Sequence, residues 1–236
     1  MPERIHNFGA GPAVLPLSVV QAVGDALPNL MDSGFGLCEI SHRSGTFQSV
    51  VDSAMERVRR VLSVPDDYTV LFLQGGASLQ FYMTALNILK DGEKADYLVT
   101  GGWAKKALKE AGRVGDATAI WDDSENGFKS VPANGDYTVR DDAVYVHYTS
   151  NNTLYGTQYH HLPDSGGKPL ILDASSDIAG VPIDVSAHEI IYADAQKNLG
   201  PSGVTLVILS PWAMEQCGED LPTMLDYNVH ASKGSL

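Results

Sequence analysis

Cysteine, positive charge and long apolar runs are all scarce in this sequence. The two cysteines, Cys38 and Cys217, lie too far apart for a metal-ligand motif and cannot form a disulfide framework. We therefore expect two reduced thiols, no metal site and a cytoplasmic location. No run approaches the roughly 18 apolar residues of a membrane span, and the first residues contain no apolar core of a signal peptide. The sequence thus predicts neither a membrane segment nor secretion.

Lysine and arginine together number 16 against 29 aspartate and glutamate residues, which gives a net charge of −13. This excess of negative charge disfavours binding to nucleic acid or to an anionic membrane surface. Any anionic ligand must therefore be held by a small local group of donors. The 236 residues are 44% hydrophobic and 19% charged, which is typical of a globular protein that needs no metal or disulfide to fold.

The apolar pattern alternates between helix and strand spacing along the chain. Helices are predicted at 17–27, 46–62 (with Thr46 as a candidate N-cap), 77–89 and 103–111. Strands are predicted at 68–73, 96–100, 143–148, 169–172, 190–193 and 204–209. Continuous apolar runs of this length indicate strands covered on both faces, as in a largely parallel sheet. Residues 1–16, rich in glycine and proline, are predicted to form an extended arm, and 17–236 a single α/β domain.

Ligands of open α/β sheets bind beyond the carboxyl ends of the strands, and three predicted strand ends carry polar motifs. These are Gln-Gly-Gly-Ala-Ser at 74–78, Asp-Ala-Ser-Ser at 173–176 and Asp-Ala-Gln-Lys-Asn at 194–198. In the first motif, Gly75 and Gly76 allow a tight turn. The amides that begin the next helix then form an anion site, to which Ser78 adds a hydroxyl. An ordinary strand-to-helix turn is the alternative interpretation.

Asp173 and Lys197 are ionisable residues of the other two motifs. Asp173 ends an apolar strand, where a partly desolvated carboxylate favours a cationic partner. It could equally be the N-cap of a following helix. Lys197 follows an apolar strand and precedes a turn rich in glycine and proline, a setting for a nucleophilic amine whose pKa is lowered by desolvation. A solvated surface lysine is the alternative.

Trp103 and the pair His42–Arg43 are two further candidate binding features. The ring of Trp103, in Gly-Gly-Trp-Ala, is placed either to stack on a planar ligand or to pack in the core. His42 and Arg43 are adjacent cations in an acidic chain and form either a carboxylate or phosphate site or a solvated loop pair. A phosphate cradle, an aromatic plate, an acid and a lysine on separate strand ends together match the requirements of pyridoxal 5′-phosphate.

The motifs that carry this chemistry also resemble those of a known family. They are Asn-Phe-Gly-Ala-Gly-Pro-Ala at 7–13, Ile-Ser-His-Arg at 40–43, Val-Leu-Phe-Leu-Gln-Gly-Gly-Ala-Ser at 70–78, Gly-Gly-Trp-Ala at 101–104, Ser-Asn-Asn-Thr at 150–153, Leu-Asp-Ala-Ser-Ser at 172–176 and Tyr-Ala-Asp-Ala-Gln-Lys-Asn-Leu-Gly-Pro-Ser-Gly at 192–203. In these stretches the chain resembles the phosphoserine aminotransferases, which are class V, fold-type I pyridoxal-phosphate enzymes. The resemblance implies the large domain of that fold: an α/β structure with a mostly parallel, seven-stranded sheet and helices on both faces.

The resemblance implies roles for the residues around the cofactor. Lys197 matches the lysine that binds the cofactor covalently and shuttles the proton, and Asp173 matches the partner of the pyridine nitrogen. Trp103 matches the tryptophan that stacks on the ring. Ala77 and Ser78 match the turn that holds the cofactor phosphate.

Further matches concern the ring, the phosphate and the substrate. Thr153 matches a threonine near the ring hydroxyl, and Gln196 matches a phosphate contact. His42 and Arg43 match the cations that receive the substrate's own phosphate, and Trp103 is expected beside the substrate as well. The implied reaction moves an amino group from glutamate to 3-phosphohydroxypyruvate and gives phosphoserine in serine biosynthesis. The resemblance also implies a homodimer with its sites at the subunit interface.

The family pattern continues beyond residues 233–236 with an Asn-Thr-Pro segment and a small C-terminal domain, and this sequence contains neither. We therefore expect 17–236 to correspond to the cofactor-binding large domain alone. Two alternatives stay open. One is another class V enzyme, such as an alanine–glyoxylate transaminase or a cysteine desulfurase. The other is a non-catalytic form that dimerises and binds the cofactor without turnover.

Overall fold

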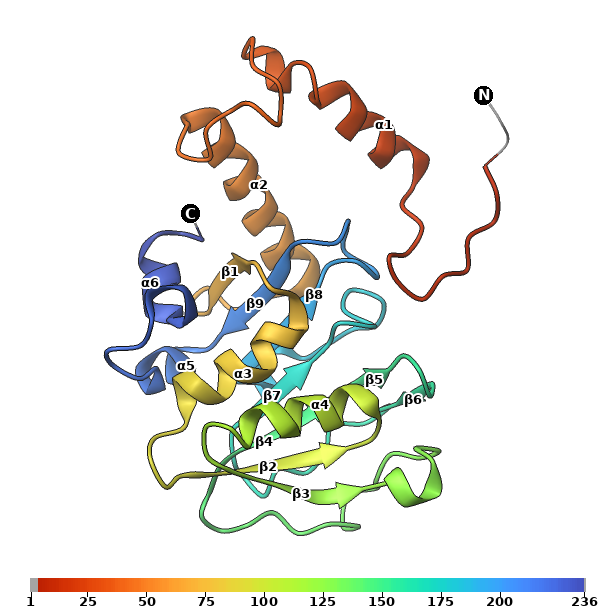
Figure 1. The fold of residues 1–236 in the computed structure, drawn as a ribbon, viewed down its shortest axis with the longest axis vertical. Coiled ribbons are helices and arrows are strands. Elements are labelled where there is room, and N and C mark those ends of the chain that lie inside the picture. Colours follow the sequence, from red (N-terminus) through yellow and green to blue (C-terminus); the bar gives the residue numbers. More distant parts are fainter. Residues whose placement is uncertain (1–3, 236) are drawn as a thin grey trace.

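A seven-stranded sheet forms the centre of the molecule in the computed structural model, which describes residues 4–235 (Figure 1). Residues 1–3 of the predicted arm and residue 236 lie outside the described range. The sheet strands are β1 (Thr69–Leu73), β2 (Lys94–Val99), β3 (Asp116–Asp122), β4 (Ala143–Thr149), β7 (Leu170–Asp173), β8 (Ile190–Asp194) and β9 (Thr205–Leu209). Their order across the sheet is β1-β9-β8-β7-β4-β2-β3.

Most of the sheet is parallel. The pairs β2–β3, β2–β4, β4–β7 and β7–β8 are parallel, whereas β9 runs antiparallel to both β8 and β1. All the strands except β9 therefore point the same way, and their carboxyl ends share one edge of the sheet. This confirms the mostly parallel, seven-stranded sheet expected from the sequence.

Helices lie against both faces of the sheet. The helices are α1 (Leu17–Ala26), α2 (Gly45–Leu62), α3 (Gly76–Ile88), α4 (Gly102–Ala111), α5 (Pro211–Gln216) and α6 (Tyr227–Ser232). Helices α3 to α6 contribute to the core on one face, and Met55 and Val58 of α2 pack on the other. Short elements complete the chain: the hairpin strands β5 (Asn151–Asn152) and β6 (Thr157–Gln158), and the 3-10 turns η1 (Leu30–Asp32), η2 (Ser124–Asn126), η3 (Val185–Ala187) and η4 (Thr223–Leu225).

Alternate residues of the central strands enter the two cores. Tyr97, Tyr145 and Tyr192 face the core under α3 and α4, and their neighbours Leu98 and Val146 face the opposite core. Successive side chains of a strand point to opposite faces, so burial of both faces requires an unbroken apolar run. The continuous runs in the sequence therefore predicted these strands correctly.

The N-cap of α2 differs from the one expected, and the sequence did not predict β3, β5, β6, α5 or α6. Helix α2 begins at Gly45, and its N-cap is Ser44, whose hydroxyl accepts the N–H of Phe47 at 3.2 Å. Thr46 was the wrong residue, because it already lies in the first turn, whereas Ser44 has the extended backbone that a cap needs. Strand β3 was not predicted, because it is an edge strand whose residues are exposed or only half-buried and so lack a continuous apolar run.

Helix α1, predicted at 17–27, projects from the body of the molecule (Figure 1). It contains no buried residue, and its apolar side chains Leu17, Val19, Val20 and Val23 are each 43–49% exposed. Residues 4–16, which precede it, contain no helix or strand. No helix within 4–235 combines the length and apolarity needed to cross a membrane.

Candidate active site

One small cavity gathers most of the candidate residues at the carboxyl edge of the sheet. Its volume is about 70 Å³, and it lies between the starts of α3 and α4 and the ends of β7 and β8. It is lined by Ala77, Ser78, Phe81, Trp103, Asn151, Asp173, Ser175, Ser176, Asp194, Gln196 and Lys197. Segments more than 100 residues apart in sequence thus meet at the edge where open α/β sheets bind ligands.

The amine of Lys197 is held by two hydroxyl groups. Its Nζ donates to Ser176 Oγ at 2.8 Å and also to Thr153 Oγ1, and the two hydroxyls hydrogen-bond each other at 2.7 Å. Burial lowers the pKa of Lys197 below its ordinary value of 10.5, although three nearby carboxylates act in the opposite direction. A larger fraction of the amine is therefore neutral and nucleophilic than in a solvated lysine. Sequence reasoning matched Thr153 and missed Ser176.

Asp173 ends β7 as a buried carboxylate that is only 2% exposed. Its Oδ1 accepts both the N–H of Ser175, at 3.1 Å, and the hydroxyl of the same serine, at 2.7 Å. Burial raises the pKa of Asp173 to about 6 against these two hydrogen bonds. Residues 175–180 form turns and no helix, so Asp173 is not a helix cap. The other interpretation of Asp173 therefore holds: it is a buried acid at the cavity, and it suits a cationic group of a ligand.

Trp103 is positioned by a residue about fifty positions further along the chain. Asn152 Oδ1 accepts the N–H groups of Trp103 and Ala104 at 3.3 and 3.4 Å, and so caps the start of α4. A Cβ on Gly101 would lie 2.3 Å from the Asn152 side chain, so glycine is required at that close approach. The Lys197 amine lies 5.9 Å from the centre of the Trp103 ring. The Asn-Asn pair at 151–152 was noted in the sequence, but nothing local in it indicated a cap for a distant helix.

The turn between β1 and α3 leaves helix amides free at the cavity. Gly75 and Gly76 have φ values of +90° and +67°, which favour glycine, and α3 has no side-chain cap. A Cβ on Gly76 would stand 2.9 Å from Asp194 Oδ2, so this turn packs directly against the end of β8. The unpaired N–H groups of the first helical turn, together with Ser78, form an anion-binding helix start.

His42 and Arg43 do not reach this cavity. Both are exposed and lie in the segment before α2. Arg43 lines a separate hollow beside α6, together with His230 and Lys233. The single chain thus brings the cofactor-site candidates together but leaves these two cations apart, and their substrate role stays a prediction.

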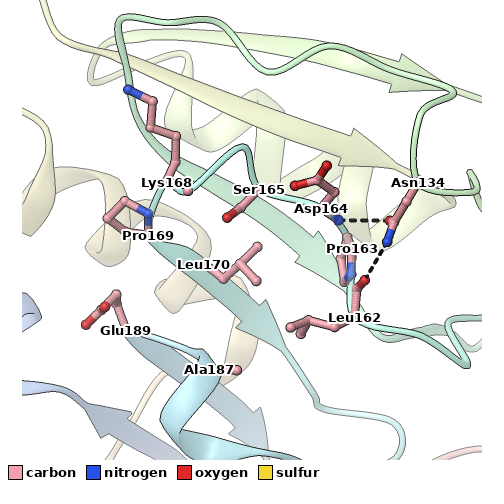
Figure 2. A pocket seen from close by; sticks show the side chains of 11 residues that line it. Asn134, Leu162, Pro163, Asp164, Ser165, Lys168, Pro169, Leu170, Ala187 and Glu189 are labelled. Atoms are coloured by element: carbon pink, nitrogen blue, oxygen red, sulfur yellow. Dashed lines mark hydrogen bonds between the residues drawn. The ribbon is translucent and has the colours of Figure 1, made fainter.

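A larger hollow at the opposite edge of the sheet carries none of the predicted residues. Figure 2 shows it beside the start of β7, with Asn134, Asp164, Leu170 and Glu189 among its lining residues. The Asn134 side chain donates to the carbonyl of Leu162 and accepts the N–H of Asp164 there. These groups satisfy one another, and the hollow lies at the amino ends of the parallel strands, so we assign the chemistry to the Lys197 cavity.

Comparisons with known proteins show which family and fold the chain shares. The family profile described as "Aminotransferase class-V" matches residues 5–223. A phosphoserine aminotransferase of Desulfotalea psychrophila is 50% identical over 236 residues, which cover 100% of this chain and 65% of that protein. The chain therefore spans just under two thirds of the length of this curated relative.

Two solved structures share the fold closely. The phosphoserine aminotransferase from Bacillus circulans subsp. alkalophilus has a TM-score of 0.93 and 42% identity, and the match covers 98% of this chain and 64% of that one. The phosphoserine aminotransferase from Trichomonas vaginalis, solved with pyridoxal phosphate bound, has a TM-score of 0.92 and 33% identity over 99% of this chain and 69% of that one.

Proposed function

The chain belongs to the class-V aminotransferase family, and we propose that it is the cofactor-binding part of a phosphoserine aminotransferase. The proposed cofactor is pyridoxal 5′-phosphate. The proposed reaction moves the amino group of glutamate to 3-phosphohydroxypyruvate and yields 2-oxoglutarate and phosphoserine, a step of serine biosynthesis. The observation that carries the proposal is that Lys197, Asp173, Trp103 and the start of α3 line one cavity.

The polar atoms of the cavity fit pyridoxal phosphate. Nε1 of Trp103 and Oε1 of Gln196 are buried and have no hydrogen-bond partner within 4–235. An unsatisfied buried polar atom costs about 1–3 kcal/mol, so a polar ligand in this cavity would stabilise both. The free amides of α3 and the Ser78 hydroxyl suit the phosphate group, and the buried Asp173 carboxylate suits a protonated ring nitrogen.

Each candidate residue of the cavity would have its own part in holding the cofactor. Lys197 would bind it covalently, and Trp103 would cover one face of its ring. Ala77 and Ser78 would hold its phosphate at the start of α3, with Gln196 beside them. When bound, the cofactor supplies an electron sink for the carbon atom that loses the amino group.

Proton movement falls to Lys197. Burial lowers the pKa of its amine below the ordinary value, which favours the neutral form that accepts a proton and later returns it. The hydroxyls of Thr153 and Ser176 fix the position of Nζ. Lys197 is half-buried and lines the same cavity as Trp103 and Asp173, and the Asp173 carboxylate favours the protonated form of its amine.

We also propose that the protein acts as a homodimer in which His42 and Arg43 serve the site of the second copy. Their separation from Lys197 within one chain supports this arrangement, because a phosphorylated substrate needs cations that the Lys197 cavity does not supply. The exposed apolar side chains of α1 offer a surface for the contact.

The proposed location is the cytoplasm. Cys38 is exposed and free, and Cys217 is buried and free. Thiols that stay unpaired are typical of a reducing compartment.

Covalent trapping of the cofactor tests the proposal. The chain is loaded with pyridoxal 5′-phosphate, reduced with borohydride and digested, and the labelled peptide is identified by mass spectrometry. The label is expected on Lys197 and is expected to disappear in Lys197→Ala. The matched control is Lys105→Ala, which removes an exposed lysine two residues from Trp103 and should keep the label. A label at another lysine, or label retained in Lys197→Ala, would contradict the assignment.

The choice of amino acceptor separates the proposed reaction from its alternatives. The loaded protein is supplied with glutamate and with either 3-phosphohydroxypyruvate or glyoxylate, and 2-oxoglutarate is measured. Preference for the phosphorylated acceptor supports the proposal, whereas preference for glyoxylate supports another class V enzyme. Cofactor trapped on Lys197 with no transfer to either acceptor supports the non-catalytic alternative.

A further inference from the structure

Ser175 forms a bridge between the ends of two strands at the cavity. Its N–H and its hydroxyl both donate to Oδ1 of Asp173, the last residue of β7, at 3.1 and 2.7 Å. Its Oγ also accepts the N–H of Asp194, the last residue of β8, at 3.2 Å. Ser175 is 8% exposed and lines the same cavity as Lys197.

The direction of the Ser175 hydroxyl is fixed by this geometry. An N–H can only donate, so the bond from Asp194 occupies a lone pair of Oγ and leaves the hydroxyl hydrogen for Asp173. Within 4–235 the hydrogen bonds of the Asp173 carboxylate use Oδ1 alone. The second oxygen, Oδ2, is therefore left for whatever enters the cavity.

We propose that Ser175 is the positioning residue of the cofactor site: it clamps one oxygen of Asp173 and ties it to the end of β8, so that the other oxygen meets the ring nitrogen of the cofactor. This inference rests on the proposed function and adds to it a residue that acts through Asp173. Because β8 leads directly into Lys197, the same bridge sets the distance between the acid and the amine.

The charged and titratable neighbours of Asp173 define what Ser175 contributes. Lys197 favours the ionised Asp173 carboxylate, and Asp177 in the turn after β7 disfavours it. The Asp173 charge in turn helps to raise the pKa of Tyr192 in β8. Burial raises the pKa of Asp173, and the hydrogen bonds from Ser175 are the largest opposing influence. Removal of the hydroxyl should therefore favour the protonated carboxyl, which cannot pair with a protonated ring nitrogen.

Ser175→Ala tests the proposal through two measurements. The first is the titration midpoint of the Asp173 carboxyl in the cofactor-free chain, followed by carbon NMR with Asp173→Asn to assign the signal. The second is the dissociation constant for pyridoxal 5′-phosphate. A hydrogen bond to a charged group is worth about 1.5–3 kcal/mol. The midpoint should thus rise by roughly one pH unit. Because about half of the carboxyl would then be protonated at pH 7, the dissociation constant at that pH should rise by at least roughly twofold.

Two further variants separate positioning from general packing. Ser175→Thr keeps the hydroxyl and should restore both values towards the wild type. Ser150→Ala removes a hydroxyl of similar burial that bonds to the main-chain carbonyl of Asp173 and to Asp177, and it should leave both values unchanged. Should Ser175→Ala fail to fold, Ser175→Cys supplies the comparison, because a thiol is a weak donor.

Wild-type values in Ser175→Ala would overturn the proposal, and so would equal changes in Ser150→Ala. Failure of the proposed function is a distinct result: borohydride would then leave no label on Lys197 of the wild-type chain. Labelling of Lys197 together with an unchanged Ser175→Ala would refute the role of Ser175 alone.

Discussion

Asp173 shows how burial sets both the chemistry and the cost of one residue. Its pKa lies near 6 because the carboxylate is desolvated, with Ser175 and Lys197 only partly offsetting that effect. At neutral pH the group is mostly ionised, as a partner for a protonated ring nitrogen must be. In the cofactor-free chain this negative charge is buried, and its desolvation costs free energy that a solvated carboxylate would not lose. Asp173 therefore lowers the free energy of unfolding of the cofactor-free chain.

Asp173→Asn should reveal this cost as a pH-dependent gain in stability. The raised pKa means that the folded chain holds a proton between pH 3.8 and about 6 that the unfolded chain has lost. The contribution of Asp173 to stability therefore falls as pH rises through that interval and stays constant above it. Across that interval the contribution of Asp173 to the free energy of unfolding should fall by on the order of 3 kcal/mol. Urea unfolding of both cofactor-free chains from pH 4 to 8 measures the difference.

Asp142→Asn is the control for this titration. Asp142 is exposed, and its hydrogen bond to Lys94 lowers the pKa of its carboxyl. Its contribution to stability is present above its ordinary pKa and is lost only in stronger acid, so it should stay nearly constant between pH 4 and 8. A stability difference between Asp173→Asn and the wild type that does not vary with pH would contradict the assignment of a raised pKa to Asp173.

Strand-to-helix junctions are the elements that build the site. The β1–α3 turn presents free amides, and the β2–α4 junction presents Trp103 through the Asn152 cap. Both junctions contain a glycine whose missing Cβ allows a close approach: Gly75 packs on Leu79, and Gly101 packs on Asn152. The glycines at these two places therefore serve packing as well as backbone conformation.

Gly75→Ala should weaken the protein and its cofactor binding together. The new Cβ would lie 2.4–2.7 Å from the Leu79 side chain at a φ of +90°, so the turn and the start of α3 must move. We expect a loss of about 2 kcal/mol or more in the free energy of unfolding and a rise of at least roughly tenfold in the dissociation constant for pyridoxal 5′-phosphate. Urea unfolding and absorbance titration measure the two effects.

Gly92→Ala is the matched control for the turn. Gly92 has a similar φ of +78°, but nothing lies within 4 Å of the position of its Cβ. The Gly92→Ala variant should lose only about 1–2 kcal/mol of unfolding free energy to backbone strain, and its cofactor binding should stay unchanged. Equal cofactor affinities in the two variants would show that the Gly75 turn does not hold the phosphate.

At the scale of the whole molecule, apolar side chains are buried unevenly along the chain. The central strands of the sheet are buried on both faces, whereas α1 has no buried residue and exposes most of its apolar side chains. His42 and Arg43 lie in the segment that joins α1 to the body. A second copy packed on α1 would bury this apolar surface and bring a second pair of cations into the assembly, as the proposed homodimer requires.

Val20→Glu and Val23→Glu in α1 should shift the chain from dimer towards monomer. Each places a charge on a side chain that the proposed contact buries, and burial of an unpaired charge is costly. Sedimentation velocity over a concentration series should show a dimer dissociation constant raised at least roughly tenfold. Gln21→Glu adds the same charge at a polar position of the same helix and is the control. A wild-type chain that stays monomeric at high concentration would refute the dimer.

The sequence by itself determined most of the longer elements and most of the candidate cofactor residues. Burial of both faces of a parallel sheet demands continuous apolar runs, and these located most of the strands. The strand-end rule directed attention to the glycine turn, Asp173 and Lys197, which the structure places around one cavity. These features were accessible because each depends on neighbours close in the chain.

Only the tertiary structure decided how these residues are held and which stand apart. Ser176 and Thr153 on Lys197, Asn152 on α4 and the Asp194 bond to Ser175 join positions from 19 to 49 residues apart. Edge strand β3 escaped prediction because its exposure depends on its place in the sheet. The distance of Arg43 from Lys197 is likewise a property of the folded chain. Such contacts depend on strand order and packing, which local sequence patterns do not encode.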